Sequence, residues 1–349
     1  MKQIIILIAL LCSTTLVAQT AFEDVLRSIE MNNNALKAGY SEMEAQKLDA
    51  KAANNLKNPT VSYLHLYGNR PGAGFQGEFV ASQSFDFPSA YVQRHKRAKE
   101  RGVSLDYQYR DMRRQILLQA KEVCLDLIYL KQQRQLLEKR YQNAKQLADA
   151  YTMRFKAGDA DILETNKIEL ELLNVDTEVR QNGMDAQKKM NELVVLNGGV
   201  PIVLADTVFF SDVSLLPLAE LLEEGMAANP DVMAKRSEQL VSNLNLKAVR
   251  SEGLPEIEVG YRMNPASGGE RFNGFMVGLS IPIFANKNKV KSAKAMTRMA
   301  DFQYENTLVS LRHELMGLYS DAVSLQESVQ LYSTLLEKQH TIALLTQAL

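Results

Sequence analysis

The residues that could carry out catalysis or hold a cofactor are few, and their spacing supports neither role. A G-x-G-x-x-G pattern occupies 72–77 and is typical of loops that bind dinucleotide phosphates. Those loops lead from a strand into a helix, whereas two alternating segments flank these glycines, so we interpret them as an ordinary turn. The four histidines, at 65, 95, 313 and 340, lack ligand spacing and cysteine companions. Met296 and Met299 fit a helix core better than a copper site. We therefore predict that the protein is not an enzyme and binds no cofactor or metal.

The composition of the 349 residues excludes further classes. The 40 Lys and Arg residues balance 41 Asp and Glu residues, and the net charge of −1 argues against a nucleic-acid partner. With 46% hydrophobic and 23% charged residues, the chain is neither disordered nor a helical membrane transporter. Two cysteines are too few for a disulfide framework. The absence of Trp and the presence of only 9 Pro favour long helices.

Residues 1–18 are organised like a secretory signal peptide. Lys2 precedes an unbroken apolar run at 4–11, and Ala18 provides a small residue for cleavage. Bulky leucines precede Cys12, so we do not expect it to be a lipidation site. No later segment approaches the roughly 18 uncharged apolar residues that a membrane-spanning helix needs. The protein is therefore predicted to be exported, and any membrane-spanning part would consist of β-strands.

Residues about 195 positions apart match one another, which indicates an internal duplication. Pro59 corresponds to Pro255 and Phe79 to Phe275, and the segment 106–109 corresponds to 301–304. We predict a first repeat over 19–200, a linker over 201–213 and a second repeat over 214–349. Because no counterpart of 155–196 is present in the second repeat, we expect this repeat to be incomplete at its C-terminus.

Each repeat contains a pair of segments with alternating apolar residues, at 59–87 and 255–284, which predicts one β-hairpin per repeat. About ten alternating residues with aromatic side chains suit a tilted strand of an outer-membrane barrel; two ordinary half-buried hairpins are the alternative. Four strands cannot close a barrel, so they either pack on helices or are pooled by several chains. Whether the chosen face meets lipid or the pore is left open. The residues chosen for the barrel strands are Val61, Tyr63, Phe79, Phe85, Ile257, Val259, Phe275 and Ile281.

A long helical hairpin is predicted over 89–197. Residues 89–155 contain no Pro, and from 116 to 155 apolar residues recur at steps of three and four, interrupted at Arg134. This heptad pattern predicts a coiled coil. Gly158 is expected to reverse the chain with a positive φ, and either Asp159 or Asp161 is expected to cap the returning helix. A second long helix is expected from 285.

The stretch 154–164 carries the most specific resemblance. It reads Arg, Phe, two further residues and Gly158, then a short polar stretch that leads to Leu163. This order resembles the hairpin tip of the TolC-type outer-membrane factors, the outer membrane efflux protein family. The strand ends at 82–88 and 279–284 are similar to those of the same family. The resemblance implies a mainly α fold with membrane β-strands: long antiparallel coiled-coil helices plus four transmembrane strands per chain, duplicated. Three chains would form a trimeric α-barrel and a twelve-stranded β-barrel.

The same resemblance implies a function and partners. The protein would be the passive outer-membrane channel of a tripartite efflux or type I secretion system in a Gram-negative cell, surrounded by outer-membrane lipid and extending into the periplasm. A periplasmic adaptor would couple it to a proton-driven inner-membrane pump for drugs or metal ions. The family associates its acidic constriction with the second hairpin tip, so no gate residues are assigned. The adaptor would dock on the first tip, at Arg154, Phe155, Gly158, Asp159, Asp161 and Leu163.

Basic residues follow the second and the fourth predicted strand. A solvated helix surface near anionic lipid is one interpretation, and a positively charged lining of the duct is the other. The residues chosen for the duct lining are Arg94, Lys96, Arg97, Lys287, Lys289 and Lys291.

Two further protein classes are alternatives to the channel. One is a periplasmic coiled-coil adaptor or scaffolding protein, which would need additional short strands that the sequence does not show. The other is an exported structural coiled coil.

Overall fold

The computed structural model describes residues 14–205, 209, 215–267, 269, 271–284 and 286–338. Most of the predicted signal peptide, including Cys12, part of the predicted linker and the segment 339–349 lie outside these described residues. The elements in chain order are α2 (Thr14–Asn32), α3 (Asn34–Ala52), β1 (Thr60–Tyr67), β2 (Phe75–Phe85), α4 (Pro88–Ala157), α5 (Ile162–Leu196), α6 (Leu218–Ala228), α7 (Pro230–Ser251), β3 (Glu256–Pro265), β4 (Arg271–Ser280) and α8 (Lys289–Lys338).

The chain divides into two compact units that differ from the two sequence repeats. The first unit is formed by residues up to 41 together with 112–214, and the second by 42–111 together with 215–349. The second unit contains strands from both repeats. The duplication therefore does not produce two separate domains, because the halves share one sheet.

The first unit is built around the hairpin of α4 and α5, against which α2 packs. Its apolar core includes Ile29 of α2, Ile128 of α4 and Leu193 of α5, each 0% exposed. The predicted heptad series places its buried members on the side of α4 that faces these helices, which confirms the periodicity. The buried members of the series are Ala120, Val123, Leu127, Leu137 and Ala148.

Polar side chains also join α5 to α4. Asn182 is 4% exposed and donates hydrogen bonds to the backbone oxygen of Leu130 at 3.1 Å and to the side-chain oxygen of Gln133 at 2.9 Å. Arg134, which interrupts the heptad series, donates to the backbone oxygen of Val179 at 3.1 Å. The interruption is thus accommodated, because the long side chain reaches the backbone of the neighbouring helix.

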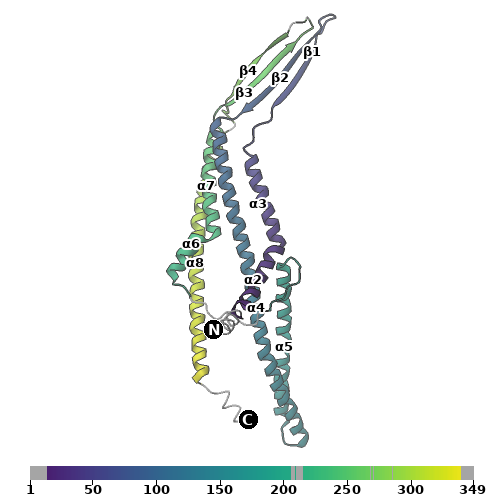
Figure 1. Cartoon of the computed structure of the whole chain (residues 1–349), viewed down its shortest axis with the longest axis vertical. Helices are drawn as coiled ribbons and strands as arrows, with labels where there is room; N and C mark the ends of the chain where they lie inside the picture. The colour runs from purple at the N-terminus through teal and green to yellow at the C-terminus, as the bar shows by residue number, and fades with distance from the viewer. Residues whose placement is uncertain are drawn as a thin grey trace, which may run out of the picture. The chain divides into compact units, whose positions relative to one another are not determined.

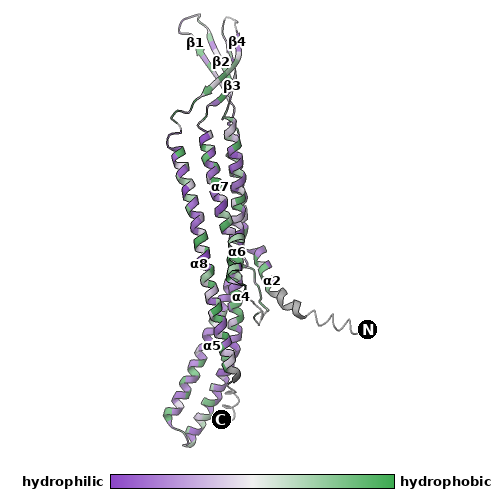
Figure 2. Cartoon of the chain, turned by 90° about the vertical axis from the view of Figure 1, so that its left-hand side faces the viewer, coloured by the Kyte–Doolittle hydropathy of each residue, from purple (hydrophilic) through white to green (hydrophobic). Residues whose placement is uncertain are grey.

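The second unit carries one antiparallel sheet with the strand order β1-β2-β3-β4. The two predicted hairpins form β1–β2 and β3–β4, and the sheet is continuous because β2 of the first repeat pairs with β3 of the second. We call this β2–β3 pairing the repeat seam; it places Phe85 opposite Ile257 and Phe79 opposite Met263. Figure 1 and Figure 2 show the sheet extending from the end of α4, α7 and α8.

Hydrogen bonds join the helices of the second unit. The side-chain amide of Gln239 on α7 donates to Asp301 on α8 at 2.8 Å, and Arg97 on α4 donates to Asn245 on α7 at 2.7 Å. Asn229 caps the start of α7, because its side-chain oxygen accepts hydrogen bonds from the first backbone amides of the helix. The strands therefore stand on a set of helices that are cross-linked by polar contacts.

The structure confirms the expected fold class of long helices and four β-strands, with differences at the boundaries. The strand β4 ends at Ser280, so Ile281, which was predicted to lie in the strand, is one residue beyond it. Pro282 follows and has no amide hydrogen to extend the ladder. The last long helix begins at Lys289 rather than at 285. None of the helices in the described ranges is long and apolar enough to cross a membrane.

Candidate functional site

The cross-strand register sorts the sheet into an apolar face and a polar face. Register partners project to the same side of a sheet, and residues alternate along each strand. Tyr63 pairs with Phe79, and Tyr261 pairs with Phe275, so large apolar side chains gather on one side. This apolar face contains every predicted barrel residue that lies within a strand: Val61, Tyr63, Phe79, Phe85, Ile257, Val259 and Phe275.

The opposite side of the sheet, the polar face, carries most of the charged and small residues, together with the apolar residues Leu64, Leu66, Val80, Phe272 and Met276. Arg262 of β3 forms an ion pair with Glu78 of β2 there. Glu258 extends over Gly278, where an added Cβ would lie 3.5 Å from its carboxylate oxygen. Such a pairing of an apolar with a polar face is what strands between lipid and a water-filled pore require. The small members of the polar face are Ser62, Ser82, Ser84, Gly260, Gly278 and Ser280.

The outer strands of the sheet, β1 and β4, have a strand partner on one side only within the described part of the chain. Their apolar-face side chains are highly exposed: Tyr67 is 82% exposed and Phe275 is 92% exposed. An edge strand presents unpaired backbone amides and carbonyls, which readily pair with a further strand. The sheet can therefore be extended at either edge by another chain.

The predicted hairpin tip is a closed turn between α4 and α5. Gly158 has a φ of +83°, as expected, and its amide donates to Phe155 O at 3.0 Å. The amide of Asp159 donates to Arg154 O at 2.9 Å, which completes a Schellman motif at the end of α4. Asp161 rather than Asp159 caps α5, since its side chain accepts a hydrogen bond from the backbone amide of residue 163 at 3.3 Å.

The tip exposes more apolar side chains than the sequence reasoning selected. Phe155 is 42% exposed and Leu163 is 64% exposed, and both belong to the predicted docking site. Met153 and Ile162, which were not selected, are 67% and 47% exposed. Their position next to Gly158, outside the heptad series, was the signal that could have identified them. All four exposed apolar side chains lie within five residues of Gly158.

The predicted basic cluster separates into two groups. The Arg94 side chain is largely buried and Arg97 is partly buried, and both are engaged within the chain, Arg94 with Asp86 and Arg97 with Asn245. The remaining lysines, Lys96, Lys287, Lys289 and Lys291, are exposed. Arg94 and Arg97 therefore hold helices and strands together in this structure. A lining of the duct stays a prediction, and the four lysines are the side chains available for it.

The sequence reasoning missed a group of charges where strands meet helices, which we call the junction cluster: Lys57, Asp86, Arg94, Glu252 and Glu256. The Nζ of Lys57 lies 3.0 Å from Asp86 Oδ1 and 2.6 Å from Glu256 Oε2. Arg94 forms an ion pair with Asp86 and lies 3.9 Å from Glu252. The side chains of Arg94 and Asp86 are each 13% exposed, so this pair is largely buried, whereas Lys57, Glu252 and Glu256 remain partly accessible to solvent. Asp86 belongs to the strand end at 82–88, which was its only signal in the sequence.

The ionisation of the junction cluster follows from its contacts. Burial alone would raise the pKa of Asp86, but the hydrogen bonds from Arg94 and Lys57 outweigh it and hold this pKa below its usual range. Burial alone would lower the pKa of Lys57, but its hydrogen bonds to Glu256 and Asp86 raise it above the usual range. Both groups are therefore charged in the folded chain at neutral pH.

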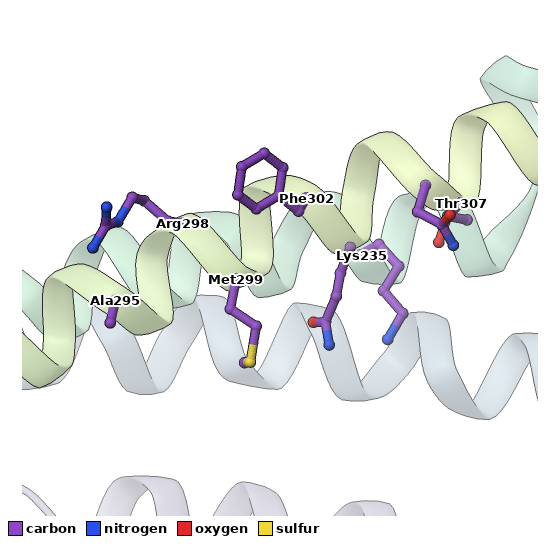
Figure 3. A pocket seen from close by; sticks show the side chains of 8 residues that line it. Lys235, Ala295, Arg298, Met299, Phe302 and Thr307 are labelled. Atoms are coloured by element: carbon purple, nitrogen blue, oxygen red, sulfur yellow. The ribbon is translucent and has the colours of Figure 1, made fainter.

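A groove lies along α8 beside Lys235 of α7 (Figure 3). Figure 3 shows Phe302 and Arg298 on one side of α8 and Met299 on the other. Phe302 is 68% exposed and Met299 is 54% exposed. Both sides of α8 beside this groove therefore carry an exposed large apolar side chain.

The glycine-rich segment at 72–77 does not lead from a strand into a helix. Gly72 and Gly74 both have a positive φ and lie between β1 and β2, as expected for a turn that joins two strands. Among the described residues, no group of three or more His, Cys, Asp or Glu side chains is arranged to hold a metal ion.

No protein-family model and no curated protein sequence matches the chain. Solved structures do match. A membrane protein from Pseudomonas aeruginosa superposes with a TM-score of 0.69 at 17% identity, covering 91% of this chain and 83% of that one. The outer membrane protein VceC of Vibrio cholerae gives 0.73 at 13% identity, with 92% and 84% covered. The CmeC outer membrane channel of Campylobacter jejuni gives 0.68 at 17% identity, with 92% and 77% covered.

These proteins share with the chain both the helical hairpin and the strand-bearing unit, since the superpositions extend over more than nine-tenths of its length. The chain therefore has the fold of these outer-membrane channels. This is the fold of the TolC-type outer-membrane factors, the family that the sequence resembles.

Proposed function

We propose that the chain is one subunit of an outer-membrane channel that conducts its cargo passively. The observation that carries this proposal is the four-stranded sheet with one apolar face, one polar face and two open edges. A closed barrel needs at least about eight strands, so the sheet must be completed by other chains. Three copies would supply twelve strands, with β1 of one copy beside β4 of the next.

In this trimer the apolar face would meet outer-membrane lipid and the polar face would line the pore. The division supports that orientation, because lipid-facing residues of such strands are apolar and pore-facing residues are polar. The exposed Phe302 and Met299 of α8 would be covered by helices of a neighbouring copy. The long helices would continue the pore as an α-barrel on the periplasmic side.

The channel would form part of a tripartite efflux or type I secretion system. A periplasmic adaptor would dock on the turn at Gly158, near the exposed apolar side chains of Met153, Phe155, Ile162 and Leu163. The adaptor would connect the channel to an inner-membrane pump driven by protons. No bond of the cargo changes in this process, so the proposal assigns no catalytic residue.

The test is expression of the full chain in a Gram-negative host, followed by fractionation and reconstitution. We expect the protein in the outer membrane, extracted by detergent as a trimer, and discrete conductance steps after its insertion into a planar bilayer. Cysteines placed on β1 and β4 should cross-link between copies in the same preparation. A monomer that needs no detergent and produces no conductance would contradict the proposal and would favour a periplasmic adaptor or a structural coiled coil.

A further inference from the structure

The repeat seam has no turn to fix its register. The strands β1 and β2 are joined by the short segment 68–74, and β3 and β4 by 266–270, so each hairpin is aligned by its own loop. In contrast, β2 ends at Phe85 and β3 begins at Glu256, with 170 residues between them. The alignment of these two strands must therefore come from contacts across the seam, together with contacts between the flanking helices α4 and α7, which Arg97 and Asn245 join.

The apolar and polar alternation restricts the register only in part. A slip by one residue would turn every apolar side chain of β3 to the polar face, so the pattern opposes it strongly. A slip by two residues keeps every side chain on its own face, and the alternation does not oppose it. Another feature must exclude slips by two residues.

The junction cluster is placed to exclude them. Because Phe85 is opposite Ile257, the next residues outward, Asp86 and Glu256, approach one another as like charges. Lys57 lies between them, 3.0 Å from Asp86 and 2.6 Å from Glu256. A slip by two residues would move one carboxylate by about 6.6 Å along the seam. Lys57 could then contact only one of them.

Connections at all four helix–strand boundaries meet in this cluster. Lys57 precedes β1, Asp86 follows β2, and Glu252 precedes β3. After β4, the side-chain amide of Asn286 donates to the backbone oxygen of Glu252 at 2.9 Å. The side-chain amide of Gln83 on β2 donates to the backbone oxygen of Lys57 at 2.6 Å. The hydrogen bond from Gln83 thus holds the backbone of Lys57 to the first repeat, while its ammonium group contacts one carboxylate of each repeat.

We propose that the junction cluster sets the register of the repeat seam and that Lys57 is its positioning residue, joining a carboxylate of each repeat. Arg94 holds Asp86 in place for this contact from α4. The ion pair between Glu78 and Arg262 crosses the seam farther from the helices and adds to the same alignment. This inference depends on the contacts within one chain and not on the channel function.

The register can be read from disulfide formation in the full chain in detergent, after both native cysteines are replaced by alanine. Ser84→Cys with Glu258→Cys reports the native register, because these residues are partners. Ser82→Cys with Glu258→Cys reports a slip by two residues, because Ser82 is the partner of Gly260. A disulfide requires Cα atoms within about 7 Å, so mild oxidation and mass spectrometry of the linked peptides distinguish the two registers.

Lys57→Met keeps the apolar part of the side chain but removes the ammonium group, so the carboxylates of Asp86 and Glu256 face one another without a positive charge between them. We expect the ratio of native to slipped disulfide to fall about fivefold, the upper range for a cross-strand charge pair. Lys57→Met with Glu256→Gln removes the repulsion and should recover part of the ratio. Arg113→Met is the matched control, because it breaks a two-hydrogen-bond pair with Glu30 in the other unit and should leave the ratio unchanged.

An unchanged ratio of native to slipped disulfide in a folded Lys57→Met chain would overturn the proposal. A ratio in the double variant as low as in Lys57→Met alone would also overturn it, because the effect would then come from packing of the side-chain stem. If the Lys57→Met chain loses its helical circular dichroism signal, the single variant Glu256→Gln is tested in its place. That variant retains the contact between Lys57 and Asp86 and should lower the ratio about twofold. A ratio equal to that of the parent would overturn the proposal in that case.

Discussion

Asn182 of α5 donates a hydrogen bond of 3.1 Å to the backbone oxygen of Leu130 inside the α4–α5 hairpin. Its amide also reaches the side chain of Gln133 at 2.9 Å. Apolar heptad positions permit several alignments of two long helices, whereas a buried polar side chain is satisfied in only one of them. The bond therefore links the packing of this hairpin to a defined alignment.

Replacing this amide should weaken the hairpin. Asn182→Ala leaves the Gln133 side chain without this partner, and we expect the free energy of unfolding to fall by about 1–2 kcal/mol. Thermal unfolding of the full chain in detergent, followed by circular dichroism, measures the change. Gln187→Ala on the exposed side of α5 removes a contact with Asn191 and serves as control. Equal unfolding temperatures for the two variants would contradict the role of Asn182.

The two faces of the sheet should respond differently to a charge. Val277→Lys places an ammonium on the apolar face, where a lipid-facing position near the membrane midplane costs about 2–4 kcal/mol. Met276→Lys alters the neighbouring residue, which pairs with Gly260 on the polar face. We expect a reduced yield of assembled trimer in outer-membrane extracts for the first variant and near-parental yield for the second. Equal yields would argue against lipid contact on the apolar face.

The turn at Gly158 should be needed for docking as well as for chain reversal. Gly158→Val forces a β-branched residue to a φ of +83°, at a cost of about 1–2 kcal/mol. Under the proposed function, we expect cross-linking to the adaptor and export to decrease while the strands remain folded.

Gly199→Val is the matched control for that substitution. Gly199 has a φ of +85° and, like Gly158, has no atom within 4 Å of an added Cβ, but it follows α5 at its other end. The Gly199→Val variant should lose about as much stability as Gly158→Val but should cross-link to the adaptor normally. If both variants retain normal cross-linking and export, the turn has no docking role.

The junction cluster predicts a dependence of stability on pH. The pKa of Asp86 is lower in the folded chain than in the unfolded one, so its contribution is complete at neutral pH and is lost as the pH falls below about 4. The pKa of Lys57 is raised, so its contribution is present at neutral pH and is lost as the pH rises beyond about 10.5. Arg94, Glu252 and Glu256 are the other charged members of the cluster.

The measurement is the unfolding temperature of the full chain in detergent at several pH values, compared with that of Asp86→Asn. The difference between the two proteins should shrink below about pH 4, because protonation then removes the same charge in the parent. A difference that stays constant from neutral to acidic pH would show that the charge of Asp86 does not contribute.

Local patterns predicted the elements well, because the deciding information lies within a few residues. The alternation around Tyr63 and Phe79 identified the strands and the residues that share a face. A lone Gly158 followed by Asp161 identified the tip, including the positive φ. The end of β4 was missed, since the apolar alternation continues to Ile281 and beyond although Pro282 interrupts the backbone ladder.

Contacts between the repeats were not predictable in the same way. Arg94 was grouped with neighbouring basic residues as part of one charged surface, yet its side chain is largely buried against Asp86. The partners of Lys57 are separated from it in the sequence by 29 and 199 residues, and no local rule identifies them. Pairing of β2 with β3 brings these groups together, so the cluster is a product of tertiary structure.

The Schellman turn at the hairpin tip limits how a partner can recognise it. The amides of Gly158 and Asp159 already satisfy the carbonyl groups of Phe155 and Arg154, so these groups are not available to an incoming backbone. Recognition would then depend on shape and on apolar side chains such as Leu163, whose association weakens little as salt concentration rises. A partner bound in this manner could rotate slightly about the turn without breaking a directional bond.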